Sequence, residues 1–364
     1  MPKKTLNRFI PAWACEETSP LPRLFRSFLF PFSIANFLIQ HTRAALYRTG
    51  VFSIRKLDAW VISVGNLSMG GSGKTPAAAL IARILQQKGM KPAILSRGYG
   101  GERKSKTPLV VSDGKNLLAG WEAAGDESYL LAKTLGDVPV LVGRDRVASG
   151  LSAMEKFSCD ALILDDGFQH LRLGRNLNLC LVDCRGRSVF ENLIFPSGSL
   201  RESVTQLKRA DAFLLTRWEE TPRAHALMQE LKARFDKPLF RARHVPIAWL
   251  ETGSGKEMDL PACGEKKVLA FCGIAAPDSF LHTLRALGIE PVAFFPFPDH
   301  HRYSPQDLRD IQSEGEGRGA ELYVTTEKDE VKLAGGVAFP LWALRIRMQV
   351  LEEEGFQSLF DFTE

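Results

Sequence analysis

The stretch VISVGNLSMGGSGKTP, from Val61 to Pro76, constrains the fold more than any other part of the chain. A short β-rich run enters a glycine-rich turn, and Lys74 and Thr75 then open a segment with helical periodicity. A phosphate-binding P-loop has this order of elements, although its usual pattern, G-x-x-x-x-G-K-[ST], has a glycine where this chain has Ser68. The substitution means only that the turn is entered differently. The stretch therefore predicts a site for nucleotide phosphates.

Each residue type in this turn suits that chemistry. Glycines let backbone N–H groups close around phosphate oxygens without interference from a Cβ atom. We expect Lys74 to reach the β- and γ-phosphates and the Thr75 hydroxyl to bind Mg²⁺. The alternative is a glycine-rich connection with an incidental lysine. The predicted nucleotide-binding residues are Gly70, Gly71, Ser72, Gly73, Lys74 and Thr75.

A second motif, ALILDDGFQH at 161–170, ends an apolar run on two carboxylates. A metal-binding aspartate of a P-loop protein must emerge at the carboxyl edge of the sheet, beside the phosphates. Neighbouring strand residues point in opposite directions, so Asp165 and Asp166 can both face the metal only if the strand ends there. We expect one to hold Mg²⁺ directly and the other more remotely. As an alternative, paired acids after a strand can simply cap the next helix.

The nucleotide is predicted to be ATP. A GTP-binding protein of this class needs an N-K-x-D motif that reads guanine. The nearest candidate is TTEKDE at 325–330, which has glutamate before the lysine and no asparagine.

Short apolar runs alternate with helical patterns through the middle of the chain. Runs without polar alternation suit strands buried on both faces of a mostly parallel sheet. We therefore predict a P-loop NTPase-like, doubly wound α/β fold. The expected strands are 60–64, 92–96, 108–112, 138–143, 160–166, 177–183 and 211–216, and the expected helices are 74–88, 126–135, 145–156 and 222–235.

A polar stretch at 252–266 precedes a second, smaller α/β unit. We predict three parts: an N-terminal segment of residues 1–57, a nucleotide-binding core of 58–250, and a unit of 251–364 that closes over the nucleotide. The expected strands of the smaller unit are 267–274, 291–297, 321–326 and 340–348, with helices at 277–287 and 304–317.

The N-terminal segment carries the positive charge of the protein. Residues 1–57 hold nine Lys or Arg against two Glu, whereas the whole chain has a net charge of only +5. Residues 21–49 are rich in Phe, Leu and Ile, and Pro31 is expected to kink or divide any helix there. Such an amphipathic segment can lie in a membrane interface, or it can form a helix pair packed on the core. The concentration of charge favours the membrane.

The remaining composition indicates a cytosolic protein. The six cysteines show no CxxC pairing, and several lie in or beside apolar runs, so buried thiols in a reducing compartment are expected. We find no uninterrupted apolar stretch of transmembrane length and no signal-peptide pattern.

Several short motifs occur along the chain in a fixed order. They are GNLSMGGSGKTP (65–76), SRGYG (96–100), GDE (125–127), DDGFQH (165–170), FPSGSLRE (195–202), FPDHHRY (297–303) and TTEKD (325–329). Together, and in this order, they resemble the tetraacyldisaccharide 4′-kinase family. The resemblance spans nearly the whole chain, and the combination is specific although each motif alone is weak. Residues up to about 20 match nothing in the pattern.

The resemblance implies a kinase that uses ATP and Mg²⁺. The γ-phosphate would pass to the 4′-hydroxyl of a tetraacyldisaccharide 1-phosphate, a lipid A and lipopolysaccharide precursor. The protein would sit peripherally or monotopically at the cytoplasmic face of the inner membrane. Its partners would be this acylated disaccharide phospholipid and the membrane surface, with neither nucleic acid nor an obligate protein partner.

The resemblance also implies the catalytic residues. In this family the base is an aspartate supported by a histidine, which correspond here to Asp126 and to His300 rather than His301. Lys74 completes the predicted catalytic set. From the residues alone, Asp126 and Glu127 could instead be a charge pair at a helix N-terminus.

Five further residues are candidates for substrate contact. Guanidinium groups suit phosphate recognition, although surface ion pairs are a competing interpretation for the arginines. The histidine of DDGFQH could equally be a packing residue. The TTEKD motif is expected to touch the nucleotide from the opposite wall. The candidates are Arg97, Tyr99, Glu127, His170 and Arg201.

Two other functions compete with the kinase. One is a cytosolic P-loop switch or metallochaperone with a protein partner, which the missing N-K-x-D and CxC motifs disfavour. The other is nucleic-acid binding by residues 1–57, which is disfavoured because apolar and aromatic residues outnumber the charges there.

Overall fold

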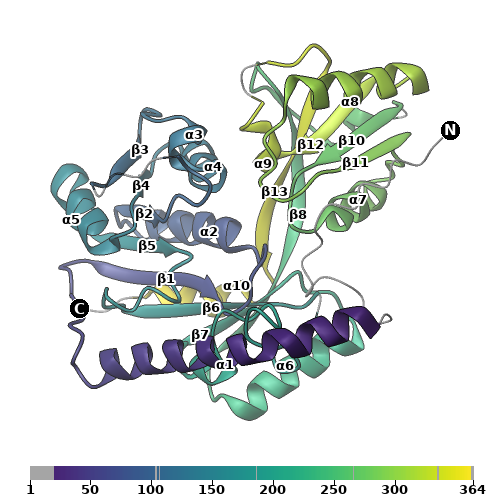
Figure 1. The fold of residues 1–364 in the computed structure, drawn as a ribbon. Helices are drawn as coiled ribbons and strands as arrows, with labels where there is room; N and C mark the ends of the chain where they lie inside the picture. The colour runs from purple at the N-terminus through teal and green to yellow at the C-terminus, as the bar shows by residue number, and fades with distance from the viewer. Residues whose placement is uncertain are drawn as a thin grey trace.

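The computed structural model describes residues 20–102, 105, 107–185, 187–264, 266–333 and 336–361, with side chains from residue 27 onward. Two units of unequal size share a single sheet of 13 strands (Figure 1). Along the sheet the strand order is β11-β10-β12-β13-β8-β7-β6-β1-β5-β2-β4-β3, and β9 pairs with β8.

The larger unit contains the predicted nucleotide-binding core. All its strand pairs are parallel except the edge pair β3–β4. The mostly parallel, doubly wound α/β prediction is therefore confirmed. The strands are β1 (Trp60–Asn66), β2 (Pro92–Ser96), β3 (Leu109–Asp113), β4 (Pro139–Val142), β5 (Ala161–Asp165), β6 (Leu177–Asp183) and β7 (Ala212–Thr216).

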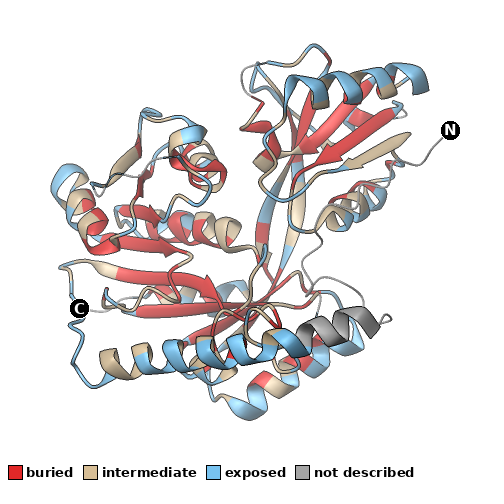
Figure 2. Cartoon of the chain, in the orientation of Figure 1, coloured by how far each residue is buried: buried red, intermediate tan, exposed pale blue. Residues whose placement is uncertain are grey.

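Helices cover both faces of this sheet and leave its strands buried (Figure 2). One face packs against α2 (Lys74–Gln87), α4 (Asp126–Leu135) and the C-terminal α10 (Glu353–Gln357). The other face packs against α5 (Arg146–Phe157) and α6 (Pro222–Arg234). The shorter elements are α3 (Trp121–Ala124) and the 3₁₀ turns Val204–Arg209, Leu260–Cys263 and Ser358–Phe360.

The smaller unit has its own two-faced core. Its strands are β10 (Val268–Cys272), β11 (Ala293–Pro296) and β12 (Leu322–Thr326). They pack between α7 (Pro277–Ala286) on one face and α8 (Pro305–Arg318) on the other. The short α9 (Glu327–Glu330) follows β12 directly.

Two long antiparallel strands, β8 (Leu239–Glu251) and β13 (Leu341–Val350), connect the units (Figure 1). β8 pairs with β7 in the larger unit, and β13 pairs with β12 in the smaller one. A two-residue strand, β9 (Glu257–Met258), returns along β8. The sequence did not predict β8, because only its ends are apolar and buried. The predicted boundary at residue 250 falls inside this strand pair, and the division into domains stays a prediction.

The N-terminal segment forms one helix, α1 (Pro20–Arg48), that lies along the larger unit (Figure 1). Pro31 was expected to kink or divide a helix here, and the division is wrong, because the helix continues through Pro31. Proline removes one backbone hydrogen bond, and the turns after it are anchored. The Ser33 hydroxyl donates to the Ile194 carbonyl at 2.9 Å, and the Asn36 amide donates to the Phe195 carbonyl at 3.0 Å. Among the described helices none is long and apolar enough to cross a bilayer.

Candidate active site

The P-loop connects β1 to α2 at the carboxyl edge of the sheet. Gly70 and Gly73 take left-handed backbone conformations, with φ of 103° and 82°. A Cβ atom at Gly73 would lie 2.9 Å from His244 Nε2, so only glycine fits there. Lys74 Nζ lies 3.5 Å from the Gly70 carbonyl oxygen and 3.7 Å from Asp166 Oδ1. The loop thus presents Lys74 beside the predicted metal-binding carboxylates.

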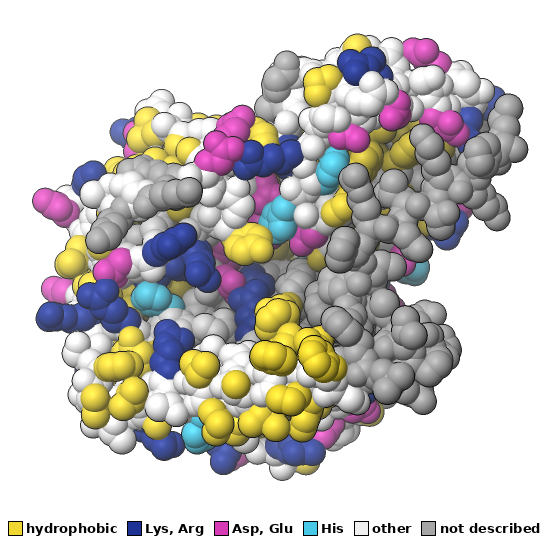
Figure 3. All heavy atoms as spheres, viewed as in Figure 1, with side chains coloured by type: hydrophobic (Ala, Val, Ile, Leu, Met, Phe, Trp, Pro, Cys, Tyr) yellow, Lys and Arg dark blue, Asp and Glu magenta, His cyan; other side chains and the backbone are white. Residues whose placement is uncertain are grey.

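The loop opens into a cleft of about 2010 Å³ between the two units. Its walls include the P-loop, one side of α1, the α7 region and the connecting strand β13. Charged side chains of both signs gather where the units meet (Figure 3). The cleft therefore brings together the nucleotide loop and the N-terminal helix.

Asp165 and Asp166 both line this cleft, because β5 ends at Asp165 and Asp166 takes a left-handed conformation with φ of 54°. Asp166 forms an ion pair with Arg201, at 2.7 and 2.8 Å. Burial opposes its ionisation, but the charges of Lys74 and Arg201 hold the pKa of Asp166 below its usual value. Neither carboxylate simply caps a following helix, since no helix of the described chain begins there.

Asp165 has a different environment. Its carboxyl group is buried, Oδ2 accepts from the Ser96 hydroxyl at 3.3 Å, and Oδ1 has no partner among the described residues. Burial, with the negative charges of Glu127 and Asp166, raises the pKa of Asp165 to about 7. A buried carboxylate oxygen without a partner is suited to a cation.

Arg146, which no sequence motif indicated, is buried at the start of α5 and lines the same cleft. Its guanidinium donates to the Gly143 carbonyl at 3.0 Å and carries a positive charge near both aspartates. Burial lowers the pKa of Arg146 to about 10, so it stays protonated at neutral pH. Arg146 belongs to no sequence motif, so nothing in the sequence distinguishes it from the other arginines of the chain.

Asp126 and His300 meet across the units, as the resemblance implies. Asp126 is the first residue of α4, and His300 lies in the turn after β11. His300 Nδ1 lies 2.8 Å from Asp126 Oδ2 and 3.0 Å from Oδ1. Burial alone would lower the pKa of His300, but the hydrogen bond to Asp126 raises it above its ordinary value. The two residues lie 174 residues apart in sequence and are brought together by the contact between the units.

The neighbouring His301 does not reach this pair. Its ring stacks on Phe297 with 4.5 Å between centroids, and Nε2 lies 3.1 Å from Asp307 Oδ2. His301 therefore anchors the turn that holds His300.

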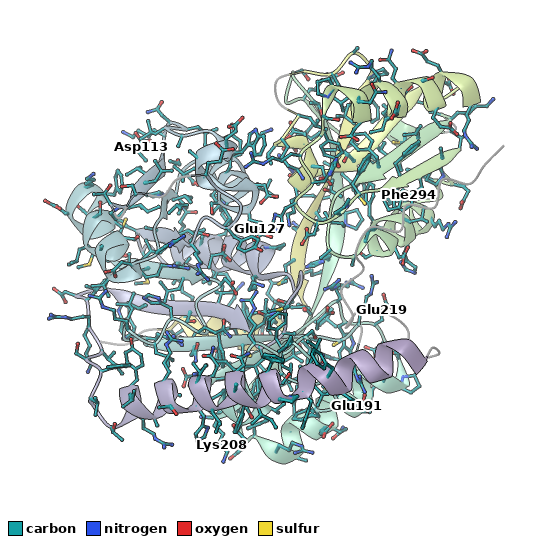
Figure 4. All side chains as sticks on the ribbon, viewed as in Figure 1. Asp113, Glu127, Glu191, Lys208, Glu219 and Phe294 are labelled. Carbon is teal, nitrogen blue, oxygen red and sulfur yellow. The ribbon has the colours of Figure 1, made fainter. Side chains whose placement is uncertain are left out.

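Lys328 of the TTEKD motif also contacts the dyad. Its ammonium group lies 3.0 Å from Glu127 Oε1, 3.0 Å from Asp299 Oδ1 and 3.4 Å from His300 Nε2. Figure 4 shows Glu127 in the region between α4 and the smaller unit. The contact of this motif with the nucleotide stays a prediction, and its lysine lies against His300 and the carboxylates of Glu127 and Asp299.

The other candidate residues all line the cleft. The Tyr99 ring packs on His300 with 5.3 Å between centroids, and Arg201 binds Asp166. His170 is partly buried, and burial together with the charges of Arg146 and Arg175 lowers its pKa to about 4. The structure thus brings Arg97, Tyr99, Glu127, His170 and Arg201 to one cavity.

The groups at the P-loop fit a magnesium–nucleoside triphosphate. Besides Asp165 Oδ1, the buried Ser72 hydroxyl has no hydrogen-bond partner among the described residues. A Cβ atom at Gly70 would have no described protein atom within 4 Å, and one at Gly71 would lie 3.9 Å from the nearest, so the turn faces open space. A carboxylate oxygen, two hydroxyls and a lysine around an open glycine turn are the donors such a ligand needs.

Known proteins match this chain over nearly its full length. The family model described as tetraacyldisaccharide-1-P 4′-kinase matches residues 25–363. The tetraacyldisaccharide 4′-kinase of Syntrophus aciditrophicus is 39% identical, and the match covers 93% of this chain and 94% of that protein. The tetraacyldisaccharide 4′-kinase of Aquifex aeolicus is 40% identical, and the match covers 92% of this chain and 98% of that protein.

A solved structure has the same fold. The crystal structure of Aquifex aeolicus LpxK in complex with ATP superposes with a TM-score of 0.75 at 37% identity, covering 92% of this chain and 98% of that one. With the P-loop, the paired aspartates and the Asp126–His300 contact in place, these matches identify the chain as a member of the tetraacyldisaccharide-1-P 4′-kinase family.

Proposed function

We propose that the cleft transfers the γ-phosphate of ATP to the 4′-hydroxyl of a tetraacyldisaccharide 1-phosphate, with the Asp126–His300 pair accepting the hydroxyl proton. This proposal is supported above all by the 2.8 Å contact between Asp126 Oδ2 and His300 Nδ1, beside the cleft that contains the P-loop. An alcohol needs its proton removed as it attacks phosphorus, and a positioned carboxylate–histidine pair does this.

His300 presents the pair to the acceptor. The side chain of His300 lines the cleft, whereas Asp126 is only 4% exposed and lies behind it. Asp126 Oδ1 also accepts from the Glu127 backbone N–H at 2.9 Å, so both carboxylate oxygens already have a hydrogen-bond partner. In this arrangement the proton reaches the pair at His300 Nε2, and Asp126 holds the imidazole and stabilises its charged form.

The P-loop and the aspartates would hold Mg²⁺–ATP. Lys74 would bind the β- and γ-phosphates, the glycine turn would surround them, and Thr75 with Asp165 would bind the cation. Asp166, which is more exposed to the cleft than Asp165, would contribute through its pair with Arg201. Bound Mg²⁺ supplies neutralisation of the charge that develops on the transferred phosphate. Arg146 adds a fixed positive charge to the same wall.

The α1 helix supports a membrane-surface location, with a lipid bilayer as the occupant of its outer face. Hydrophobic side chains gather over α1 (Figure 3), and Phe28 and Ile39 are 70% and 64% exposed. The exposed Arg48 at its C-terminal end suits anionic head groups. The other side of α1 lines the cleft, so an acylated acceptor could keep its chains in the bilayer while its sugar reaches His300. We place the protein at the cytoplasmic face, where ATP is available.

The test is ATP-dependent phosphorylation of the acylated disaccharide 1-phosphate in detergent micelles, with the wild type, Asp126→Asn and His300→Gln. We expect each substitution to lower kcat by about 10²- to 10⁴-fold, because His300→Gln removes the proton acceptor and Asp126→Asn removes the charge that orients and stabilises it. Equilibrium binding of ATP should stay within a few-fold of the wild type. A wild-type protein that binds both ligands but forms no phosphorylated lipid would contradict the proposed reaction.

A further inference from the structure

Lys328 is the only ammonium group among the described residues that an observed contact places on the Asp126–His300 pair. Its side chain is largely enclosed, with 17% exposed. Its three contacts are with Glu127 on the larger unit and with Asp299 and His300 on the smaller unit. The ammonium group therefore joins the two halves of the active site.

The contacts of His300 favour one neutral tautomer. An ionised Asp126 carboxylate can only accept, so Nδ1 carries a proton. A lysine ammonium can only donate, so the approach of Lys328 at 3.4 Å favours a lone pair on Nε2, against the negative charge of Asp299. The neutral imidazole with this tautomer, protonated on Nδ1 and open on Nε2, is the form that can take a proton from an alcohol. At 3.4 Å the contact with Nε2 is the longest of the three, and an incoming hydroxyl can replace it.

Resting on the proposed kinase function, we infer that Lys328 is a positioning residue for phosphoryl transfer. Its ammonium group holds the His300 imidazole against Asp126 across the two units and keeps Nε2 free to accept the proton of the acceptor hydroxyl.

The charges around His300 support this role. Asp126 faces Nδ1, and Asp299 Oδ2 lies 3.6 Å from Nε2; both favour the protonated imidazole. Lys328 opposes them, and the Tyr99 ring on the remaining side carries no charge. Glu127 contacts Lys328 rather than His300. Without Lys328 the imidazole would face carboxylates alone and would stay protonated to higher pH.

The residues on either side of Lys328 hold it in place. Glu327 accepts from the Ile346 backbone N–H at 3.2 Å and from Arg345 at 2.8 Å, at the irregularity in connecting strand β13. Asp329 is fully buried and accepts from the Gly273 backbone N–H at 3.0 Å, while the Gly273 carbonyl accepts from the His300 backbone N–H at 3.2 Å. The lysine and the histidine are thus fixed to one buried frame.

The experiment measures the pH dependence of kcat/KM for wild type, Lys328→Met and Lys328→Arg with Mg²⁺–ATP and the acylated acceptor in detergent. Lys328→Met keeps the aliphatic stem and removes the charge. For Lys328→Met we expect kcat at pH 7 to fall about 10²-fold. We also expect the acidic limb of its pH profile of kcat/KM to move up by about one pH unit, so that part of the loss is recovered at about pH 9. Lys328→Arg keeps the charge and should leave the acidic limb in place, with a smaller loss in kcat because a planar guanidinium cannot match all three contacts.

The matched control is Lys133→Met. Lys133 also joins α4 to α9, through Glu330 at 2.7 Å, but it does not touch the dyad. The acidic limb of the kcat/KM profile of Lys133→Met should lie at the same pH as in the wild type. An unmoved limb in Lys328→Met, or an equal shift in Lys133→Met, would overturn the inference. If Lys328→Met folds poorly, Lys328→Arg is the test. A shift of its acidic limb away from the wild-type pH would overturn the inference as well. A wild type without transferase activity would instead refute the proposed function.

Discussion

Adjacent identical residues differ in role at this site. Asp166 is neutralised by Arg201, whereas Asp165, one residue earlier, is buried with an oxygen that has no partner among the described residues. His300 faces Asp126, whereas His301 stacks on Phe297. In each pair the left-handed backbone at Asp166 or His300 turns successive side chains toward different surroundings. Sequence patterns identify such pairs, but only the backbone conformation assigns their roles.

The raised pKa of Asp165 makes stability depend on pH. Its pKa is about 7 in the folded protein and ordinarily 3.8, so protonation favours the folded state. That stabilisation is fully present below pH 3.8 and is lost as pH rises through 7. In the metal-free protein we expect Asp165→Asn to raise the free energy of unfolding by roughly 1–3 kcal/mol at about pH 8, and by less at about pH 5.

Urea denaturation of the metal-free protein at both pH values measures this difference. Asp166→Asn is the control and should destabilise the protein, because it leaves Arg201 without its partner. Equal gains for Asp165→Asn at the two pH values would show that its pKa is not raised.

At the scale of elements, apolar runs predicted most of the fold. The strands and the longer helices lie within a few residues of the predicted ranges, because strands buried on both faces leave an uninterrupted apolar signal. β8 was missed since its central residues pass between the units, are partly exposed, and include Pro246. Pro31 was predicted to kink or divide the helix, and the division was wrong, because contacts beyond the helix outweigh the loss of one hydrogen bond.

The α1 helix gives a prediction for membrane binding. Replacing Phe28, Phe32 and Ile39 together with serine removes apolar area from the exposed face without touching the contacts of Ser33 and Asn36. We expect the affinity for vesicles that contain anionic phospholipid to fall at least about tenfold. Vesicle flotation measures the bound fraction.

The control replaces three exposed leucines outside α1, namely Leu117, Leu118 and Leu151. This variant should float with the vesicles as the wild type does. If both triple variants lose binding equally, the loss reflects general hydrophobicity rather than a docking face on α1.

At the scale of the whole molecule, the active site is completed by contacts between the units. Besides the dyad and its lysine, Lys133 binds Glu330 at 2.7 Å, and Arg302 forms an ion pair with Glu102. No local pattern links residues so distant in sequence. The pairing across the dyad was available only through the family resemblance, and neither the contact of Lys328 with His300 nor the position of Arg146 in the cleft was predicted. The P-loop and the paired aspartates were predictable because each forms a local motif at a strand end.

Weakening these contacts should open the molecule. Lys133→Met combined with Arg302→Met removes two ion pairs that link the units and spares the dyad. We expect a larger radius of gyration in small-angle X-ray scattering and a fall in kcat/KM of about 3- to 10-fold, in keeping with the modest strength of such pairs. High salt should produce a similar expansion in the wild type. An unchanged radius in both cases would mean that the connecting strands alone set the arrangement.

The return of the chain to the larger unit matters for biosynthesis. Phe356 and Phe360 pack with Phe240 on the same sheet face as α2, so residues synthesised after the smaller unit complete a core whose other parts were made first. Until Phe356 and Phe360 are made, that face of the nascent protein lacks part of its cover. Translation that stops before Phe356 would therefore release a chain that contains its P-loop but whose larger unit lacks part of its core.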